Sequence, residues 1–368
     1  MENYLRIVVA FLKYDYGIKE RGYSGEEQIW LPALTKVADE VVPFWLEENG
    51  FPNNNSLLQK NLINFVEEIK PDIVFFMLMN DEITLDTLDI LKQKTTTINW
   101  FWDDHWRFES FTKYVAPKLT YSITVDKYSL QKYKNIGCEN VILSQGAVFE
   151  YVEFIEKNII NYKYDISFVG GKNSTREWII EELRKSGYSV ECFGSGWKNG
   201  KVSFDEMKNI FIETKINLNI SNSLPYDIRF YNFLKQNNKN QNLKIDIREP
   251  IKTLKSIKSK LFPGVKYYTP KNREQIKARN FEIPGCGGFQ LTNYVLSLED
   301  YYDIGKEIIV YANIDDLKSQ LEYYLIHEEE REQIKKAGHA RSRNYTYEDR
   351  LKSIISDIYF KKNISRRI

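Results

Sequence analysis

The chain has 368 residues, of which 42% are hydrophobic and 28% charged, a composition typical of a globular protein rather than a disordered one. The formal net charge of +1 gives no overall argument for binding nucleic acid. The length is too great for one small core and fits two domains of ordinary size.

Cysteine usage and hydropathy indicate the compartment. Cys138, Cys192 and Cys286 are widely separated and fit neither a metal-ligand spacing nor a disulfide framework, which favours a reducing environment. The first residues lack the layout of a signal peptide, and no apolar run is long enough to cross a bilayer. We expect a soluble cytoplasmic protein; contact with the inner face of the membrane is left open.

The first part of the chain, residues 1–152, alternates apolar runs suited to buried parallel strands with helical patterns. The expected strands are 5–12, 41–44, 73–77, 97–102, 122–125 and 140–143, and the expected helices are 26–38, 57–69, 83–94 and 127–135. A loop containing Gly22 follows the first strand. This order places backbone amides and a helix N-terminus at the carboxyl edge of a sheet, where anions bind.

Ionisable residues follow the strand expected at 97–102, namely Asp103, Asp104 and His105. The carboxyl end of a buried strand is where an open α/β sheet carries its chemistry. A purely structural histidine, hydrogen-bonded between tryptophans, is the alternative for His105.

The strand–helix series restarts after residue 160. The expected strands are 165–171, 189–193, 216–220, 289–291 and 307–311, and the expected helices are 174–185, 204–213, 273–281, 314–326 and 328–337. A last helical pattern covers 347–359. Two such series predict an α/β protein of two doubly wound domains that face each other across a cleft.

A basic segment interrupts the second series. Residues 235–279 hold thirteen Lys or Arg residues against three Asp or Glu residues, and 237–242 is Asn-rich and predicted to be a mobile loop. A basic amphipathic helix at 252–260 could meet an anionic membrane surface or a phosphate-bearing acceptor. A solvated insertion is the alternative.

A Gly-rich turn follows a short acidic segment at 279–292. Glu282 could accept two hydrogen bonds from a vicinal diol such as a ribose, and Arg279 is within reach of a phosphate on the same helix face. Gly287 and Gly288, together with Gly285, let the backbone approach a ligand closely. The alternative is a structural turn joining a helix to a strand.

Four segments give the chain a resemblance to GT-B glycosyltransferases of the group with CgeB-like spore-maturation proteins and bacterial surface-polysaccharide enzymes. They are 22–26 (GYSGE), 102–107 (WDDHWR), 168–171 (FVGG) and 277–292. The segments 305–308 and 330–338 are similar to the family's C-terminal pattern. The resemblance spans nearly the whole chain apart from an insertion at about 224–272.

The resemblance implies a GT-B fold of two Rossmann-like domains. Residues 1–152 would form the acceptor side and 160–346 the donor side, with 347–368 packing back on the first domain. The implied activity is metal-independent transfer of a hexosyl group from a nucleotide sugar to a hydroxyl of a glycan, lipid-linked or protein acceptor, in bacterial surface glycan or glycoconjugate synthesis. No cofactor and no nucleic-acid partner is expected.

The same resemblance suggests roles for the donor site. Glu282 would hold the ribose hydroxyls, and Glu274 stands at the E-x7-E spacing that places the first Glu near the transferred sugar. The leaving nucleoside diphosphate needs cations or aligned N–H groups. The candidates are Lys215, Lys277 and Arg279, with the turns at Gly22 and at Gly170 and Gly171.

On the acceptor side, an inverting enzyme needs a base, for which Asp103, Asp104 and His105 are the candidates. A retaining enzyme can pass that proton to the leaving phosphate, and these residues would then bind the acceptor. Two other classes stay open: a nucleotide-sugar epimerase of GT-B fold, and a non-catalytic sugar-binding or coat-assembly protein.

Overall fold

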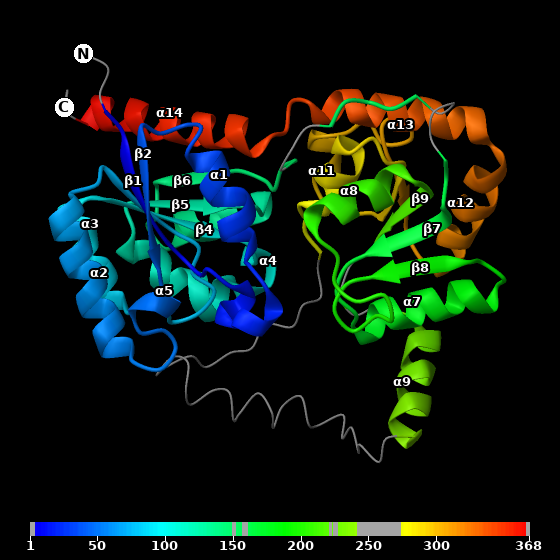
Figure 1. The fold of residues 1–368 in the computed structure, drawn as a ribbon, viewed down its shortest axis with the longest axis horizontal. Coiled ribbons are helices and arrows are strands. Elements are labelled where there is room, and N and C mark those ends of the chain that lie inside the picture. Colours follow the sequence, from blue (N-terminus) through cyan, green and yellow to red (C-terminus); the bar gives the residue numbers. More distant parts are fainter. Residues whose placement is uncertain are drawn as a thin grey trace. The chain divides into compact units, whose positions relative to one another are not determined.

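The structure is a computed structural model with two compact units, and each holds one all-parallel sheet with helices packed around it (Figure 1). The described residues of the N-terminal unit lie in 4–145 and 347–365, and those of the C-terminal unit lie between 146 and 346. The structure describes residues 4–148, 152–156, 161–220, 223, 227–240 and 274–365.

The N-terminal sheet has the strand order β2-β1-β3-β4-β5-β6. Its strands are β1 (Arg6–Phe11), β2 (Glu40–Trp45), β3 (Ile73–Phe76), β4 (Thr96–Phe101), β5 (Tyr121–Thr124) and β6 (Val141–Leu143). Val8 of β1 pairs with Val42 on one side and Val74 on the other. Strands β1 and β3 are almost wholly apolar, and β4 is buried along its whole length, because helices cover both faces of a parallel sheet.

The helices of the N-terminal unit surround this sheet. They are α1 (Leu31–Leu34), α2 (Asn55–Ile69), α3 (Leu85–Lys94), α4 (Asp104–Arg107), α5 (Lys113–Val115), α6 (Leu130–Asn135) and α14 (Tyr347–Ser365). Helix α14, at the far end of the chain, packs on α1. The rings of Trp30 and Tyr347 lie 4.7 Å apart between centroids, and Leu351 and Ile354 are buried.

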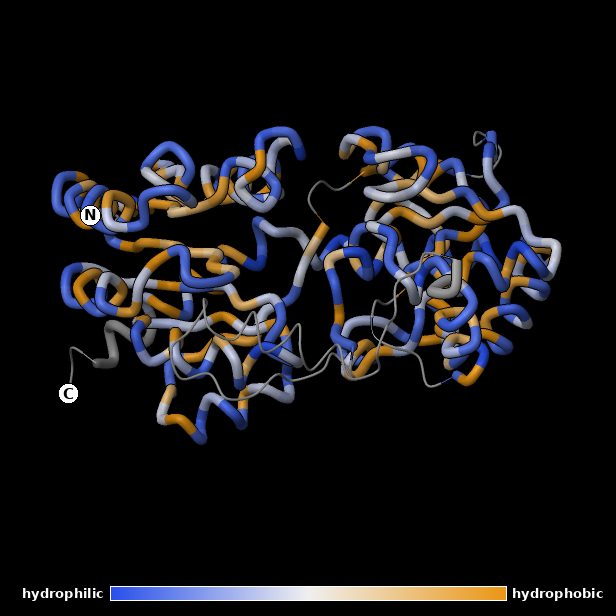
Figure 2. Tube along the Cα trace, turned by 90° about the horizontal axis from the view of Figure 1, so that it is seen from below, coloured by the Kyte–Doolittle hydropathy of each residue, from blue (hydrophilic) through white to orange (hydrophobic). Residues whose placement is uncertain are grey.

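The C-terminal sheet has the strand order β11-β10-β9-β7-β8. Its strands are β7 (Tyr164–Val169), β8 (Val190–Phe193), β9 (Thr214–Asn219), β10 (Gln290–Asn293) and β11 (Ile309–Tyr311). The helices are α7 (Ser174–Lys185), α8 (Phe204–Ile212), α9 (Ile228–Asn240), α11 (Arg279–Gly285), α12 (Ile314–Ile326) and α13 (Glu328–Ser342). In Figure 2, hydrophobic stretches lie inside each unit, whereas hydrophilic ones are frequent on the outer turns. The prediction of a two-part α/β fold is confirmed.

Three local expectations differ from the structure. The helix expected at 26–38 is a π-helical turn (Glu26–Trp30) followed by the short α1, which has a proline in its first turn. The helix expected at 273–281 begins only at Arg279. The Asn-rich stretch expected to be a loop is helical up to Asn240, because Phe230 and Phe233 anchor α9 in the core. The basic helix expected at 252–260 lies outside the described residues.

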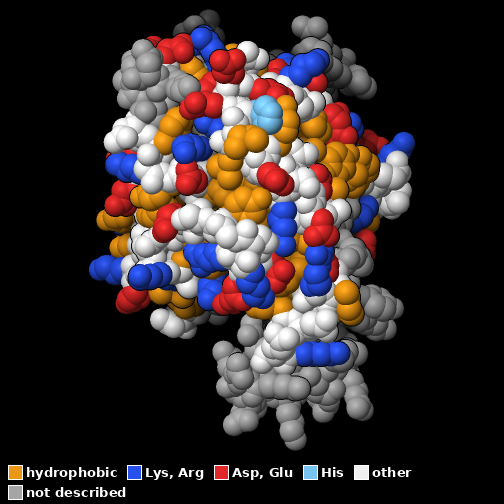
Figure 3. All heavy atoms as spheres, turned by 90° about the vertical axis from the view of Figure 1, so that its right-hand side faces the viewer, with side chains coloured by type: hydrophobic (Ala, Val, Ile, Leu, Met, Phe, Trp, Pro, Cys, Tyr) orange, Lys and Arg blue, Asp and Glu red, His pale blue; other side chains and the backbone are white. Residues whose placement is uncertain are grey.

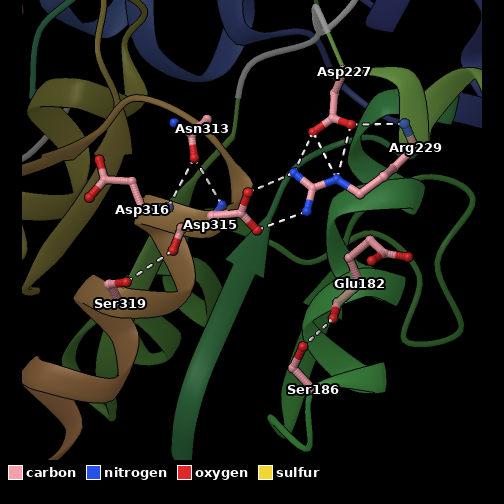
Figure 4. Close-up of polar contacts among 8 residues, drawn as sticks. All are labelled: Glu182, Ser186, Asp227, Arg229, Asn313, Asp315, Asp316 and Ser319. Carbon is pink, nitrogen blue, oxygen red and sulfur yellow. Dashed lines mark hydrogen bonds and ion pairs between the residues drawn. The ribbon is translucent and has the colours of Figure 1, made fainter.

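A charged contact joins α9 to α12 within the C-terminal unit (Figure 4). Arg229 donates from both terminal nitrogens to Asp315, at 2.8 and 2.9 Å, and also binds Asp227 at 2.7 Å. The Asn313 side chain accepts from the Asp315 and Asp316 amides, each at 3.0 Å, and so caps α12. The bidentate geometry fixes the direction in which α9 leaves the unit.

Among the described residues, the chain passes between the units after Gln145 and after Thr346. These two passages are adjacent on the C-terminal unit, because Val148 forms a parallel bridge with Thr346 and its amide donates to the Tyr345 carbonyl at 2.7 Å. Gly146 packs so closely that an added Cβ would lie 2.7 Å from the Cα of Ala278. The start of the C-terminal unit is therefore fixed against the segment that leads into α11.

The surface of the C-terminal unit that Figure 3 shows carries blue and red side chains interspersed with small orange patches. Positive and negative groups are mixed over this face. Within the described ranges, no helix is both long and apolar enough to span a membrane.

Candidate donor and acceptor sites

The first candidate site lies in the C-terminal unit, where Glu274 precedes α11. Its side chain is only 10% exposed. One carboxylate oxygen accepts hydrogen bonds from both the amide and the hydroxyl of Ser223, the former at 2.5 Å. The other oxygen lies 3.7 Å from the amino group of Lys277. Glu274 is thus held in a fixed orientation by the segment that follows β9.

The second part of this site is the first turn of α11, where Arg279 and Glu282 form an ion pair between Nη1 and Oε2. Helix α8 supports the guanidinium: the sulfur of Met207 lies 2.9 Å from Nη1, and the Phe211 ring centroid lies 5.5 Å away. The Glu282 side chain is 6% exposed. The predicted spacing of three residues therefore does place the cation and the carboxylate on one helix face.

Arg176, in the first turn of α7, joins this cluster, although it is not among the residues predicted from the sequence. Its Nε and Nη1 donate to the carbonyls of Ile220 and Gly171, at 3.0 and 2.7 Å. Burial lowers the pKa of Arg176 to about 10, while the charge of Glu274 opposes that shift. An arginine shortly after the Gly170–Gly171 turn was the sequence signal that could have identified it.

The two glycines that end β7 differ in their surroundings. The amide of Gly170 donates to the Phe193 carbonyl at 2.9 Å, and its carbonyl accepts from the indole of Trp197 at 2.9 Å. A Cβ at Gly171 would meet no atom within 4 Å. The backbone of Gly170 is therefore occupied within the protein, whereas Gly171 faces open space beside Arg176.

Three predicted donor residues lie at the other end of the sheet. Lys215 is the second residue of β9 and pairs with Asp165 at 2.6 Å, roughly 13 Å along the strand from Asn219. Gly287 and Gly288 lead into the amino end of β10, and a Cβ at Gly288 would lie 2.8 Å from the side-chain Nδ2 of Asn217. The structure does not bring these three residues together with Glu274, Arg279 and Glu282.

The acceptor candidates lie in the N-terminal unit, where Asp104 is fully buried at the start of α4. Its two carboxylate oxygens accept from the hydroxyls of Thr112, Thr124 and Tyr133, at 2.6, 2.6 and 2.7 Å. Burial raises the pKa of Asp104 to about 6, although these hydrogen bonds oppose the shift. In this geometry Asp104 ties α4 to β5 and α6 and has no route to a ligand.

Asp103 is partly exposed, and it lines a hollow of about 10 Å³ together with Trp102 and Arg107. His105 is buried, with 5% exposure. Gly22 also belongs to this unit, in the loop after β1, where its φ of +84° and the surrounding space fit glycine. Of the predicted trio at 103–105, Asp103 is the one whose side chain lines a hollow.

Among the residues that the structure describes, no group of three or more His, Cys, Asp or Glu side chains could hold a metal ion.

Comparison with known proteins agrees with the architecture. Residues 250–356 match a family model described as glycosyl transferase-like. HepE (Alr3699) of Anabaena, solved with UDP and glucose, is 10% identical with a TM-score of 0.58, and the match covers 97% of this chain and 100% of HepE. A search of curated protein sequences finds no match.

Two further solved structures are similar. WaaB, a lipopolysaccharide outer core galactosyltransferase, is 10% identical with a TM-score of 0.53, and the match covers 96% of this chain and 99% of WaaB. TarM is 11% identical with a TM-score of 0.52; the match covers 83% of this chain and 58% of TarM. The chain thus spans less than two thirds of the length of TarM. It has the GT-B fold.

Proposed function

We propose that the protein is a glycosyltransferase that moves a sugar from a nucleotide sugar to an acceptor hydroxyl. The observation that carries this proposal is the pairing of Arg279 with Glu282 on α11, next to Glu274 and Arg176, in the C-terminal unit of a GT-B fold. The match of residues 250–356 to a glycosyl transferase-like family supports it.

The donor site provides what the leaving group requires. The acceptor oxygen bonds to the anomeric carbon, the bond from that carbon to the diphosphate breaks, and the electron pair leaves with the nucleoside diphosphate. Arg279, Lys277 and Arg176 would stabilise the charge that develops there. Glu282 would accept from the ribose hydroxyls, and Glu274 would lie beside the transferred sugar.

The acceptor would bind on the N-terminal unit. Asp103 is the proposed group that receives the acceptor proton in an inverting reaction. Asp104 would hold α4 in position through its buried hydrogen bonds. The catalytic step would need no metal, since cationic side chains are available for the leaving group. Residues 1–145 with α14 would thus act as the acceptor part and the C-terminal unit as the donor part.

The solved relatives suggest which substrates to test first. HepE was solved with UDP and glucose and with UDP-glucose, and WaaB is a galactosyltransferase. UDP-hexoses are therefore the first donors to test, and glycan acceptors of bacterial surface polymers the first acceptors. A cytoplasmic location would give the enzyme access to nucleotide sugars.

The test is nucleotide binding by calorimetry and thermal shift with UDP, GDP, ADP, CMP and TDP and their sugars. We expect one base to bind at micromolar strength, about −8 kcal/mol. Glu282→Gln and Arg279→Gln should each weaken that binding at least tenfold. If no nucleotide binds to the folded parent protein, the donor site proposed here is wrong.

Product analysis with and without acceptors then separates the classes. A transferase forms a glycosylated acceptor and free nucleoside diphosphate in equal amounts. An epimerase converts the nucleotide sugar without any acceptor, and a binding protein leaves it unchanged under all conditions. Either of the last two results would refute the transferase.

A further inference from the structure

Arg107 ends α4 in the N-terminal unit, at the carboxyl end of β4. Its guanidinium lies between two aromatic rings, 4.7 Å from the centroid of Phe111 and 5.7 Å from that of Trp106. Nη2 donates to the Asn80 side chain at 3.2 Å. These rings and this one amide hold the guanidinium in place, but none of them carries the opposite charge.

Several other arginines have a carboxylate partner, whereas Arg176 and Arg184 donate to backbone carbonyls. Arg6, Arg21, Arg229, Arg279 and Arg341 each contact Asp or Glu within 3.0 Å. By contrast, Arg107 forms no ion pair with an Asp or Glu of the described residues, and the nearby carboxylates act on it only through space.

The nearest acidic residues are arranged around Arg107 without neutralising it directly. Glu82 is buried, and its carboxylate accepts from the Asn80 amide at 2.7 Å, which shapes the turn that presents Asn80 to Arg107. Burial lowers the pKa of Arg107, while the more distant charges of Asp103 and Glu82 oppose that shift. A half-buried cation without an anionic partner is costly, and an anionic ligand would remove that cost.

Space for such a ligand exists beside the guanidinium. The hollow lined by Asp103, Arg107, Trp102 and Thr112 has a volume of about 10 Å³, which admits one oxygen-sized group. A larger ligand would therefore insert a single oxygen and remain outside with its other atoms. Asp103 and Arg107 thus offer a proton acceptor and an anion receptor around one opening.

We propose that Arg107 binds an oxyanion carried by the acceptor, a phosphate or a carboxylate, close to the hydroxyl that receives the sugar. The proposal rests on the transferase function, and it specifies the acceptor as an anionic one. The guanidinium would donate a charge-assisted hydrogen bond to the one oxygen that enters the hollow, and either anion carries such an oxygen. Asp103, being negative, would face the hydroxyl rather than the anion.

The test uses the Nε–Hε resonances of the arginines, measured by NMR on the full chain. Glycerol 1-phosphate, inorganic phosphate and glucuronate are titrated as anions, with glycerol and glucose as neutral counterparts. If the nucleotide screen identifies a nucleoside diphosphate that binds, it is added at saturating concentration so that it occupies the donor cations. Arg107→Lys identifies the Arg107 resonance, and Arg107→Gln removes the charge. Lys113→Gln, which breaks the pair with Glu109 nearby, is the matched control for the loss of a positive charge.

We expect the Arg107 resonance to shift with anions and not with glycerol or glucose. Affinity for the preferred anion should fall at least tenfold in Arg107→Gln and less in Arg107→Lys, and should be unchanged in Lys113→Gln. A preference for glycerol 1-phosphate indicates that the acceptor carries a phosphate. A preference for glucuronate indicates that it carries a carboxylate. An unmoved resonance, or equal anion affinity in the parent and Arg107→Gln, would overturn the proposal.

The two proposals fail in distinguishable ways. Nucleotide affinity in Arg107→Gln should equal that of the parent, because the donor residues belong to the other unit. If no nucleotide binds, the transferase proposal fails while the NMR titration still reports anion binding. If nucleotides bind and the Arg107 resonance does not shift with any anion, only the proposal of an anionic acceptor is refuted. Equal thermal midpoints of the parent and the variants show that the fold is intact.

Discussion

Arg279 and Glu282 contact each other across the first turn of α11, with a side-chain exposure of 26% and 6%. Each therefore satisfies the other's charge in the free protein. A nucleotide sugar would have to share or replace this contact, the phosphate taking the guanidinium and the ribose taking the carboxylate. The pair would then act as a preformed receptor rather than as two separate contacts.

Position along the sheet provides a first prediction. Lys215→Ala should leave nucleotide affinity within twofold of the parent, because Lys215 pairs with Asp165 at the amino end of the strands. The stability loss should be under about 1 kcal/mol, as for an exposed ion pair. Calorimetric titration in parallel with Arg279→Gln checks this. A tenfold loss of nucleotide affinity in Lys215→Ala would show that Lys215 does contribute to the donor site.

A second prediction concerns Arg176. Arg176→Lys removes the paired donation to the Gly171 and Ile220 carbonyls, so the free energy of unfolding should fall by about 1–3 kcal/mol. Nucleotide affinity should fall as well. Arg184→Lys is the control: Arg184 donates to the Val190 carbonyl at the other end of α7, and its loss should leave nucleotide affinity unchanged. Equal nucleotide affinity in Arg176→Lys and Arg184→Lys would show that Arg176 does not contribute to the donor site.

A third prediction follows from the raised pKa of Asp104, about 6 in the folded protein. The unfolded chain should titrate near 3.9, so the native state binds the proton more tightly. The contribution of Asp104 to stability is therefore greatest below about pH 4, falls as the pH rises to about 6, and is constant above that. Asp104→Asn removes this dependence.

Urea unfolding of the parent and Asp104→Asn at pH 4 and pH 7 measures the effect. The stability advantage of the parent over the variant should be about 2–3 kcal/mol larger at pH 4 than at pH 7. Parallel pH profiles for the two proteins would show that Asp104 is not the titrating group.

A fourth prediction concerns Gly338 on α13, where an added Cβ would collide with the carbonyl oxygen of Glu307. Because the backbone carbonyl of Glu307 cannot move without a cost in free energy, Gly338→Ala should lower the free energy of unfolding by about 1–3 kcal/mol. Gly25→Ala is the control, since Gly25 has helical angles and open space around it and should be neutral or stabilising. Equal thermal midpoints for the two variants would contradict the close packing of α13.

Much of the fold could be predicted from the sequence because parallel strands buried on both faces are rich in apolar residues. The runs near Val8 and Val74 illustrate this, whereas β9 also carries the buried Asn217 and Asn219. Helix ends were less predictable. The helix before the Gly-rich turn begins at Arg279 rather than at 273, because Ser223, far away in sequence, binds Glu274 and holds it outside the helix.

The candidate sites were predictable only where spacing within one helix decides. Arg279 and Glu282 are three residues apart on α11, and this local relationship can be read directly. The burial of Asp104 depends on Thr124 and Tyr133, which come from later elements. Arg107 was visible as a residue of the WDDHWR segment, but its lack of a carboxylate partner is a property of the folded surroundings.

The bridge between Val148 and Thr346 means that, among the described residues, the chain enters and leaves the C-terminal unit at neighbouring points. Domains whose ends lie close together tolerate excision and permutation. A short linker from Gln145 to Tyr347 should therefore close the N-terminal unit on itself with α14 retained. Residues 146–346 could be produced as a separate protein whose two ends are joined by the bridge between Val148 and Thr346. Nucleotide recognition could then be studied apart from acceptor recognition.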